Sequence, residues 1–382
     1  MYKHLTHCLL LFLLVAITAC KSDEDTSQQP TTSEKTIFVF MPNSDNLYSD
    51  FLSNISGMKS AIVNKGGLGN TRLIIFIAKD RQNSALINIK YEKGVCQQDT
   101  LENFTSPTYL TTMGRTELLN KVKQYAPAKR YGMIVGCHGT GWIPKRSAQK
   151  KISSRYIGGM TSAYQINIDE FAQSITDAGM KMQFILFDDC YLSCIEVAYD
   201  LKNATDHIIA STSEIMQYGM PYHTIYGRLM DAEPDYKAVC DDFYDFYSKS
   251  RYPYGTIGVT DCRYIDEMAA VMRNINATHV FDESLEGDIQ DLDGKTFTPT
   301  IFYDFDDYVR QLCGNDATAY SQYADVMQRL VPYKAATQYI YSGPKETATK
   351  INHFSGMAVS DPSTNNEVKD SKKNTNWWIA TH

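Results

Sequence analysis

A cysteine at the end of an apolar run is the first residue in this sequence whose type and place suggest chemistry. Residues 184–187 read Phe-Ile-Leu-Phe, which is typical of a strand buried on both faces of a parallel sheet. Asp188, Asp189 and Cys190 follow at once. Apolar residues then recur at helical spacing, so we expect Cys190 where a strand ends and a helix begins. Open α/β sheets place their ligand crevices at such ends.

Two opposing effects act on the thiol of Cys190. The amide groups of a helix start favour the thiolate by roughly 0.3–1 kcal/mol. Asp188 and Asp189 would cancel that gain if both faced the sulfur, so we expect at least one of them to point elsewhere, toward a substrate. The alternative interpretation is that Cys190 is a small buried apolar residue, the commonest fate of a free cysteine.

A histidine among glycines is the second candidate. Residues 136–142 read Gly-Cys-His-Gly-Thr-Gly-Trp and follow an expected strand at 131–135. Glycines leave the backbone open to close approach, and an imidazole at a strand end can swing over the neighbouring strand end. His138 precedes Cys190 by 52 residues, which fits one crossover unit. The pair therefore favours nucleophilic catalysis over a core or turn histidine.

Strands and helices alternate along the rest of the chain. Short apolar runs predict strands and helical periodicity predicts helices; the strands are expected at 37–40, 73–78, 86–91, 131–135, 184–187, 207–210, 255–260 and 354–359, and the helices at 52–58, 116–125, 265–272 and 320–330. This alternation predicts an α/β fold with a mostly parallel sheet covered on both faces. The segment 86–91 alternates in polarity, so we expect it near a sheet edge. Residues 377–379, Trp-Trp-Ile, are apolar enough to pack.

The first 35 residues are expected to direct export and anchoring. Residues 9–16 form an apolar core that is too short to span a bilayer. The tetrapeptide ending at Cys20 resembles the lipobox of bacterial lipoproteins, which predicts a signal peptide at 1–19 and lipidation of Cys20; the alternative is an ordinary signal peptide cleaved nearby. Residues 20–35 are the lipidated cysteine and a disordered tether. The acidic cluster after Cys20 resembles the signal that sends Bacteroidetes lipoproteins to the outer face of the outer membrane.

Composition limits the partners and cofactors. The formal net charge of -7 and the lack of a basic stripe argue against nucleic acid. Seven cysteines remain after the signal and lipid site, an odd number without a disulfide framework. Zinc on Cys137, His138, Cys190 and Cys194 is disfavoured because adjacent strand residues point to opposite faces. We expect no metal site and no cofactor; whether calcium is required does not follow from the sequence.

Two segments together resemble a known family. The stretches Y-G-M-I-V-G-C-H-G-T-G-W (131–142) and F-I-L-F-D-D-C-Y-L-S-C-I-E-V-A-Y-D-L (184–201) are similar to the paired motifs of the clostripain-like cysteine peptidases, and the resemblance covers most of residues 36–361. It implies a caspase-like α/β/α sandwich in one domain, 36–382. It also implies a Cys190–His138 dyad, an oxyanion held by backbone amides near Gly139, and peptide or protein substrates.

The resemblance bears on specificity as well, with two departures. Asp188 matches an acid that lines the specificity pocket in relatives that cleave after Arg or Lys. Cys137 replaces a frequent Asp before the histidine, which looks harmless to the dyad. Tyr218 replaces a usual second acid, which weakens the basic preference; Glu214 is a candidate substitute charge.

Two further expectations concern processing and activity. The basic loop 143–155 has no apolar pattern, and some relatives cut themselves in this interval; an intact solvated loop is the alternative. A catalytically silent surface lipoprotein that binds peptides in the same pocket is the second class of function, and the intact Cys190 and His138 argue against it.

Overall fold

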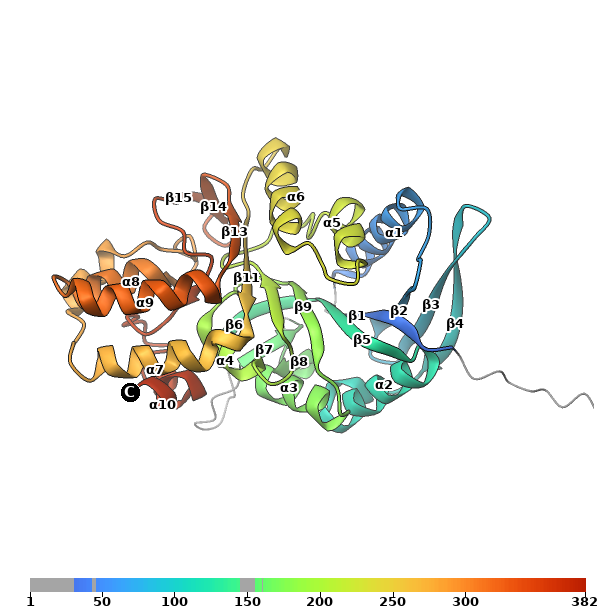
Figure 1. Ribbon diagram of the computed structural model, residues 1–382, viewed down its shortest axis with the longest axis horizontal. Helices are drawn as coiled ribbons and strands as arrows, with labels where there is room; N and C mark the ends of the chain where they lie inside the picture. Colours follow the sequence, from blue (N-terminus) through green and yellow to red (C-terminus); the bar gives the residue numbers. More distant parts are fainter. Residues whose placement is uncertain (1–30, 43–45, 145–154, 160) are drawn as a thin grey trace, which may run out of the picture.

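The computed structural model describes residues 31–42, 46–144, 155–159 and 161–382. The expected signal peptide, Cys20, most of the tether and residues 145–154 of the expected cleavage loop lie outside this part of the chain. The described residues form a nine-stranded sheet in the order β13-β11-β10-β9-β5-β1-β2-β3-β4 (Figure 1). Its five middle strands are parallel: β10 (His207–Ala210), β9 (Met182–Asp188), β5 (Ala128–Gly136), β1 (Ser33–Met41) and β2 (Thr71–Asp80).

Antiparallel strands complete both edges of this sheet. They are β3 (Asn83–Glu92) and β4 (Val95–Phe104) on one side, and β11 (Thr256–Asp261) and β13 (Tyr333–Ala336) on the other. The expectation that 86–91 lies near an edge is confirmed, because β3 is the neighbour of the edge strand. The edge strand β4 was not predicted, since its mostly polar residues lack the apolar run or regular alternation that marks a strand.

Helices cover both faces of the sheet and confirm the α/β/α sandwich (Figure 1). One face packs against α1 (Tyr48–Asn64), α5 (Tyr222–Leu229) and α6 (Tyr236–Lys249), and the other against α2 (Thr112–Tyr125), α3 (Ile168–Asp177), α4 (Ile195–Leu201) and α7 (Ile265–Asn276). Strand β1 shows why: Ile37 and Val39 join the first core, and Phe38 and Phe40 the second. Successive side chains of a strand point to opposite faces of the sheet, so β1 contributes to both apolar cores.

Smaller elements extend the sandwich beside β11 and around the strand ends. They are β6 (His138–Pro144), β7 (Arg155–Gly158), β8 (Gln165–Asn167), β12 (Tyr303–Asp304), β14 (Tyr339–Ser342), β15 (Thr347–Lys350), β16 (Ala358–Val359), α8 (Phe305–Cys313), α9 (Ala317–Leu330) and α10 (Asn376–Thr381), with short 3-10 turns at Thr108–Leu110, Ser162–Tyr164, Cys262–Tyr264, Glu283–Asp288 and Ser371–Asn374. The expected strand at 354–359 is wrong in extent. Only Ala358–Val359 is extended, and it pairs with β12 outside the main sheet.

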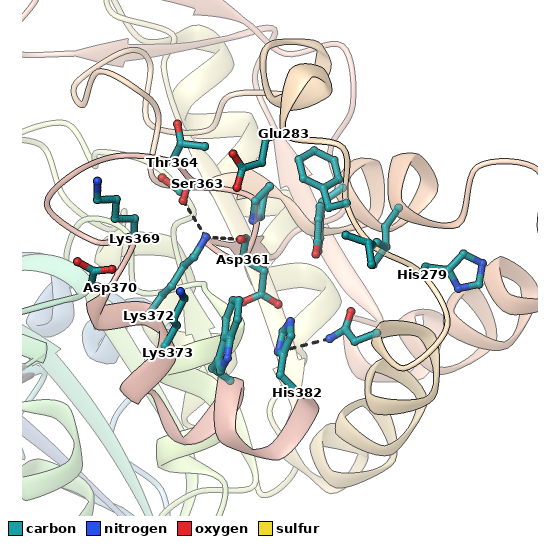
Figure 2. Close-up of a pocket in the computed structure, with 17 residues that line it drawn as sticks. His279, Glu283, Asp361, Ser363, Thr364, Lys369, Asp370, Lys372, Lys373 and His382 are labelled. Atoms are coloured by element: carbon teal, nitrogen blue, oxygen red, sulfur yellow. Dashed lines mark hydrogen bonds between the residues drawn. The ribbon is translucent and has the colours of Figure 1, made fainter.

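The C-terminal segment packs back onto the α7–α8 region around a cavity of about 510 Å³ (Figure 2). Trp377 is fully buried, and its indole Nε1 donates to Asp361 Oδ2 at 3.2 Å. The Lys372 ammonium donates to the carbonyls of Asp361 and Ser363. The expectation that 377–379 packs is therefore confirmed for Trp377, whereas Ile379 is exposed.

A close approach between β11 and the segment before β16 provides a test of this fold. A Cβ at Gly258 would stand 2.0 Å from the carbonyl oxygen of Gly356. We expect Gly258→Ala to lower the free energy of unfolding by about 1–3 kcal/mol, because backbone must move to make room. Gly227→Ala in α5 is the control: its Cβ meets nothing within 4 Å, and a helical Gly→Ala change stabilises by up to about 1 kcal/mol. Urea unfolding curves measure both; equal midpoints would contradict the packing.

Candidate active site

The carboxyl ends of β5 and β9 bring the two sequence candidates together. In the parallel pairing of these strands Gly136 is level with Asp188, so His138 and Cys190 each leave the same edge of the sheet two residues later. Both are half-buried. A Cβ at Gly139 would stand 2.8 Å from the Cys190 carbonyl oxygen. Only a glycine at position 139 lets the start of β6 approach the turn at Cys190 this closely.

Cys190 lies in a turn and not at a helix start, which corrects the sequence expectation. Helix α4 begins at Ile195, with Cys194 as its extended N-cap residue. The turn between them hydrogen-bonds to the segment after β10: Tyr191 N donates to Ser213 O at 3.1 Å and Ser193 N to Ser211 O at 2.9 Å. The apolar spacing was misleading because turn residues of this segment are buried in the core as deeply as helical ones would be.

The thiol of Cys190 is kept neutral by its surroundings. Burial raises its pKa to about 12, and the carboxylates of Glu214, Asp189 and Asp188 act in the same direction. One donor opposes them, the amide of Ile215, which lies 3.3 Å from the sulfur. Ionisation in this environment requires a nearby base to accept the proton, because bulk water would leave the thiol protonated at neutral pH.

Asp188 is buried and held by residues of α1, of the segment that leads into α5 and of α5 itself. Its carboxylate accepts from Met220 N at 3.0 Å, the hydroxyl of Tyr222 at 3.0 Å and Asn54 Nδ2 at 3.2 Å. Burial raises the pKa of Asp188 to about 6, although the hydrogen bonds from Tyr222 and Met220 oppose the rise. At neutral pH this carboxyl is therefore mostly ionised and already accepts three hydrogen bonds.

Asp189 serves the opposite side of the site. It is fully buried, and its Oδ1 accepts from the backbone amide of Cys137 at 2.8 Å, which ties the nucleophile turn to the strand before His138. Burial raises the pKa of Asp189 well above its usual range, and the charge of Asp188 acts in the same direction, although the hydrogen bond from Cys137 opposes the rise. Its Oδ2 has no hydrogen-bond partner among the described residues. Both acids thus hydrogen-bond to groups other than the sulfur, and the expectation that one of them faces a substrate stays a prediction.

The loop after β10 closes over Asp188. Gly219 has a φ of +63°, and a Cβ there would stand 2.8 Å from Asp188 Oδ2. The buried hydroxyl of Tyr247 donates to Gly219 O at 2.9 Å and fixes the loop. Tyr218, the residue that replaces the usual acid, is 45% exposed and lies edge-on to Phe246. Its ring therefore stands at the outside of this loop.

Asn46 is a site residue that the motif analysis did not assign a role. Its Oδ1 lies 3.0 Å from Nε2 of His138. Strand β1 pairs directly with β5, with Phe40 level with Val135, so the loop after β1 must lie beside the loop after β5. An amide in the loop that follows the first strand is the signal that could have identified it.

Other ligand sets do not assemble here. Among the residues that the structure describes, no three His, Cys, Asp or Glu side chains are grouped as a metal site requires. None of the seven cysteines of the described chain is in a disulfide bond. Cys137 and Cys194 are buried in the core on the α2–α7 face of the sheet.

The fold and the paired strand ends define the class of the protein: it is a cysteine peptidase built on a caspase-like sandwich. The model of the clostripain family matches residues 39–370, and the chain belongs to this family. A search of curated proteins finds no match.

Solved structures of similar chains support this assignment. A secreted C11 cysteine protease from Bacteroides thetaiotaomicron, named iotapain, is 44% identical over 92% of this chain and 100% of its own, with a TM-score of 0.86. An inactive zymogen C11 protease from Parabacteroides distasonis is 28% identical over 92% and 99%, with a TM-score of 0.78. A clostripain from B. thetaiotaomicron ATCC 29148, in complex with the peptide inhibitor BTN-VLTK-AOMK, is 47% identical over 59% and 99%, with a TM-score of 0.57.

The contact between Asn46 and His138 generates a prediction. Asn46→Ala should lower kcat by about three- to tenfold, since one neutral hydrogen bond contributes about 0.5–1.5 kcal/mol to holding the ring. Asn46→Asp should keep most of the rate and move the acidic limb of the pH–rate profile upward, because a carboxylate stabilises the imidazolium and His138 must be neutral to accept the thiol proton. Peptide hydrolysis between pH 5 and 10 measures both, with the exposed Asn64→Ala as control. An unchanged rate and profile in Asn46→Ala would remove Asn46 from the site.

Proposed function

We propose that this cysteine peptidase is an endopeptidase that uses Cys190 as nucleophile and His138 as general acid and base. The observation that supports it best is that Gly136 and Asp188, each two residues before a candidate residue, are level in the pairing of β5 with β9, with Gly139 packed against the Cys190 carbonyl. His138 takes the thiol proton, and the sulfur attacks the scissile carbonyl carbon. The amides near Gly139 and Cys190 receive the oxyanion, and His138 returns the proton to the leaving amine.

Hydrolysis of the acyl-enzyme completes the cycle. A water molecule gives a proton to His138 and its oxygen to the acyl carbon, and the Cys190 thiol is regenerated when it takes that proton back. The high pKa of the thiol makes the proton transfer to His138 the step that creates the nucleophile. A base at this position is consequently required even at neutral pH.

The nucleophile prediction separates chemistry from folding. Cys190→Ala should abolish peptide hydrolysis and leave the thermal midpoint within a few degrees, because the sulfur accepts only one backbone hydrogen bond. Cys194→Ala is the control: this cysteine is buried in the core beside the turn, so its loss should cost some stability and little activity. Measurable turnover by Cys190→Ala would refute the assignment.

We further propose that cleavage follows Arg or Lys, with Asp188 as the acid that recognises the basic side chain. Asp188 is mostly ionised above about pH 6, and its carboxylate packs against Gly219 in the loop after β10. The inhibitor in the complex with the B. thetaiotaomicron clostripain contains the peptide sequence VLTK, which ends in K. A charged hydrogen bond contributes roughly 1.5–3 kcal/mol, so one carboxylate favours Arg or Lys over a neutral residue by about one to two powers of ten.

This preference should depend on pH in a defined direction. The pKa of Asp188 is raised to about 6, so its charge is lost as the pH falls through that value. The ratio of kcat/KM for a Lys peptide over a matched norleucine peptide should therefore drop between pH 7 and pH 5. Asp188→Asn should remove both the preference and its pH dependence. The free energy of unfolding of this variant at pH 7 should be the same or higher. A carboxyl group whose pKa is raised by folding destabilises the folded protein at pH values above the pKa of the unfolded chain, and Asn removes this effect. A norleucine peptide cleaved faster than the Lys peptide at pH 7 would contradict the basic preference.

Self-processing in loop 143–155 is a separate part of the proposal. Five basic residues lie in this interval, and β6 and β7 hold its two ends side by side, so a cut there would leave both fragments paired in the fold. The inactive zymogen among the similar structures is compatible with maturation. Purified wild type should yield two fragments by mass spectrometry, and Cys190→Ala should remain one chain. Intact wild type, or equal cleavage in both, would overturn self-processing.

We also propose that Cys20 carries a lipid that anchors the protein to the outer membrane, and that the domain faces the cell surface. The lipobox-like tetrapeptide supports the anchor. In the described part of the chain, no helix is long and apolar enough to cross a membrane. Similar structures include a protease described as secreted.

A further inference from the structure

The residue after the nucleophile adopts a backbone conformation that needs support. Tyr191 has a φ of +63°, which is rare and costly for any residue other than glycine. Its side chain is 4% exposed. The ring stacks on Phe302 with centroids 4.9 Å apart and planes 7° apart, and Phe297 lies at 6.1 Å. The packing of this ring therefore holds the turn that presents Cys190.

The phenol oxygen of Tyr191 joins a polar network inside this packing. It lies 3.0 Å from Glu214 Oε1 and 3.2 Å from Thr296 Oγ1. Thr296 Oγ1 is in turn 2.8 Å from Glu214 Oε1 and 2.7 Å from the hydroxyl of Ser342. Four residues that are distant in sequence thus meet beside the nucleophile turn.

Glu214 connects this network to two other elements. Its second oxygen accepts from the amide of Gly343 at 2.9 Å, in the turn that joins β14 and β15. The next residue, Ile215, donates its amide to the Cys190 sulfur at 3.3 Å. The carboxylate expected to be a substitute specificity charge is therefore engaged with three donors around the nucleophile turn.

The chemistry of these contacts calls for a carboxylate. All three groups that face Glu214 are donors: the hydroxyls of Tyr191 and Thr296 and the amide of Gly343. An amide side chain would turn an N–H toward one of them. The negative charge of Glu214 also raises the pKa of the Cys190 thiol, which is a disadvantage for a cysteine nucleophile. The two acceptor oxygens of a carboxylate, which satisfy all three donors, offset this disadvantage.

We propose that Glu214 is a positioning residue for hydrolysis: it fixes Tyr191, and with it the direction of the Cys190 sulfur and amide, by tying the nucleophile turn to Thr296 and the β14–β15 hairpin. The proposal rests on Cys190 being the nucleophile. Loss of a residue with this role lowers kcat, the rate at which bound substrate is hydrolysed, more than it changes the affinity for substrate, because the residue orients the attacking group.

A matched pair at Thr296 tests the hydrogen bonds apart from packing. Thr296→Val keeps the shape of the side chain and removes the hydroxyl, and Thr296→Ser keeps the hydroxyl. We expect Thr296→Val to lower kcat by about tenfold with KM within about twofold, the effect of losing bonds to a charged group. Thr296→Ser should stay within about twofold of wild type. Tyr191→Phe, which deletes only one oxygen, should reproduce the loss seen with Val.

The pH dependence of Cys190 alkylation by iodoacetamide adds an independent readout. Glu214→Gln should lower kcat and shift the alkylation midpoint to lower pH, because a negative charge that opposes the thiolate is removed. Thr296→Val should lower kcat without that shift. Wild-type rates in Thr296→Val and Tyr191→Phe, or an equal loss in Thr296→Ser, would overturn the positioning role. Hydrolysis by wild type whose Cys190 is alkylated would instead overturn the proposed nucleophile.

Discussion

The candidate site depends on one constraint, the parallel pairing of β5 with β9, whose register is constant from Gly132 and Phe184 to Gly136 and Asp188. Gly132 shows how the register is specified: a Cβ there would stand 2.5 Å from the ring of Phe184, so the ring packs over a glycine of its neighbour. A slip by one residue would move every side chain to the opposite core. The register also makes Gly136 level with Asp188, so the chain leaves the two strands toward His138 and Cys190 at the same end of the sheet.

The electrostatics of the site follow from its position at the buried carboxyl ends of two middle strands of the sheet. Burial keeps the pKa of the Cys190 thiol high, and the charges of Glu214, Asp189 and Asp188 act in the same direction. A protonated thiol is a poor nucleophile and resists oxidation, so the enzyme is protected until substrate is bound. Two of these acids also hold the backbone around the site. Asp188 packs against the loop at Gly219, and Asp189 accepts a hydrogen bond from the amide of Cys137.

The sequence predicted the parts of the fold that local patterns encode. Apolar runs identified the middle strands, and the spacing of His138 and Cys190 matched one crossover. The start of α4 was misplaced because apolar periodicity cannot distinguish a buried turn from a helix. Strand β4 was missed because a polar edge strand is defined by its partner β3 and carries little apolar signal.

The remaining site residues are brought together only by the tertiary fold. Asn46 reaches His138 from the loop after a third strand, β1, 92 residues away. Thr296 reaches Tyr191 across 105 residues. Neither position has a local pattern that points to the other, so contacts of this kind require the sheet order and the packing of the loops above it.

Covalent labelling tests the central claim, that Cys190 is the nucleophile activated by His138. The protein would be treated with a peptide acyloxymethyl ketone ending in Lys, and the modified residue located by tandem mass spectrometry. The mechanism predicts one label per chain, on Cys190 alone among the seven cysteines of the described chain, and a much slower reaction in His138→Ala. A label on another residue, or equal labelling of Cys190 in His138→Ala, would contradict it.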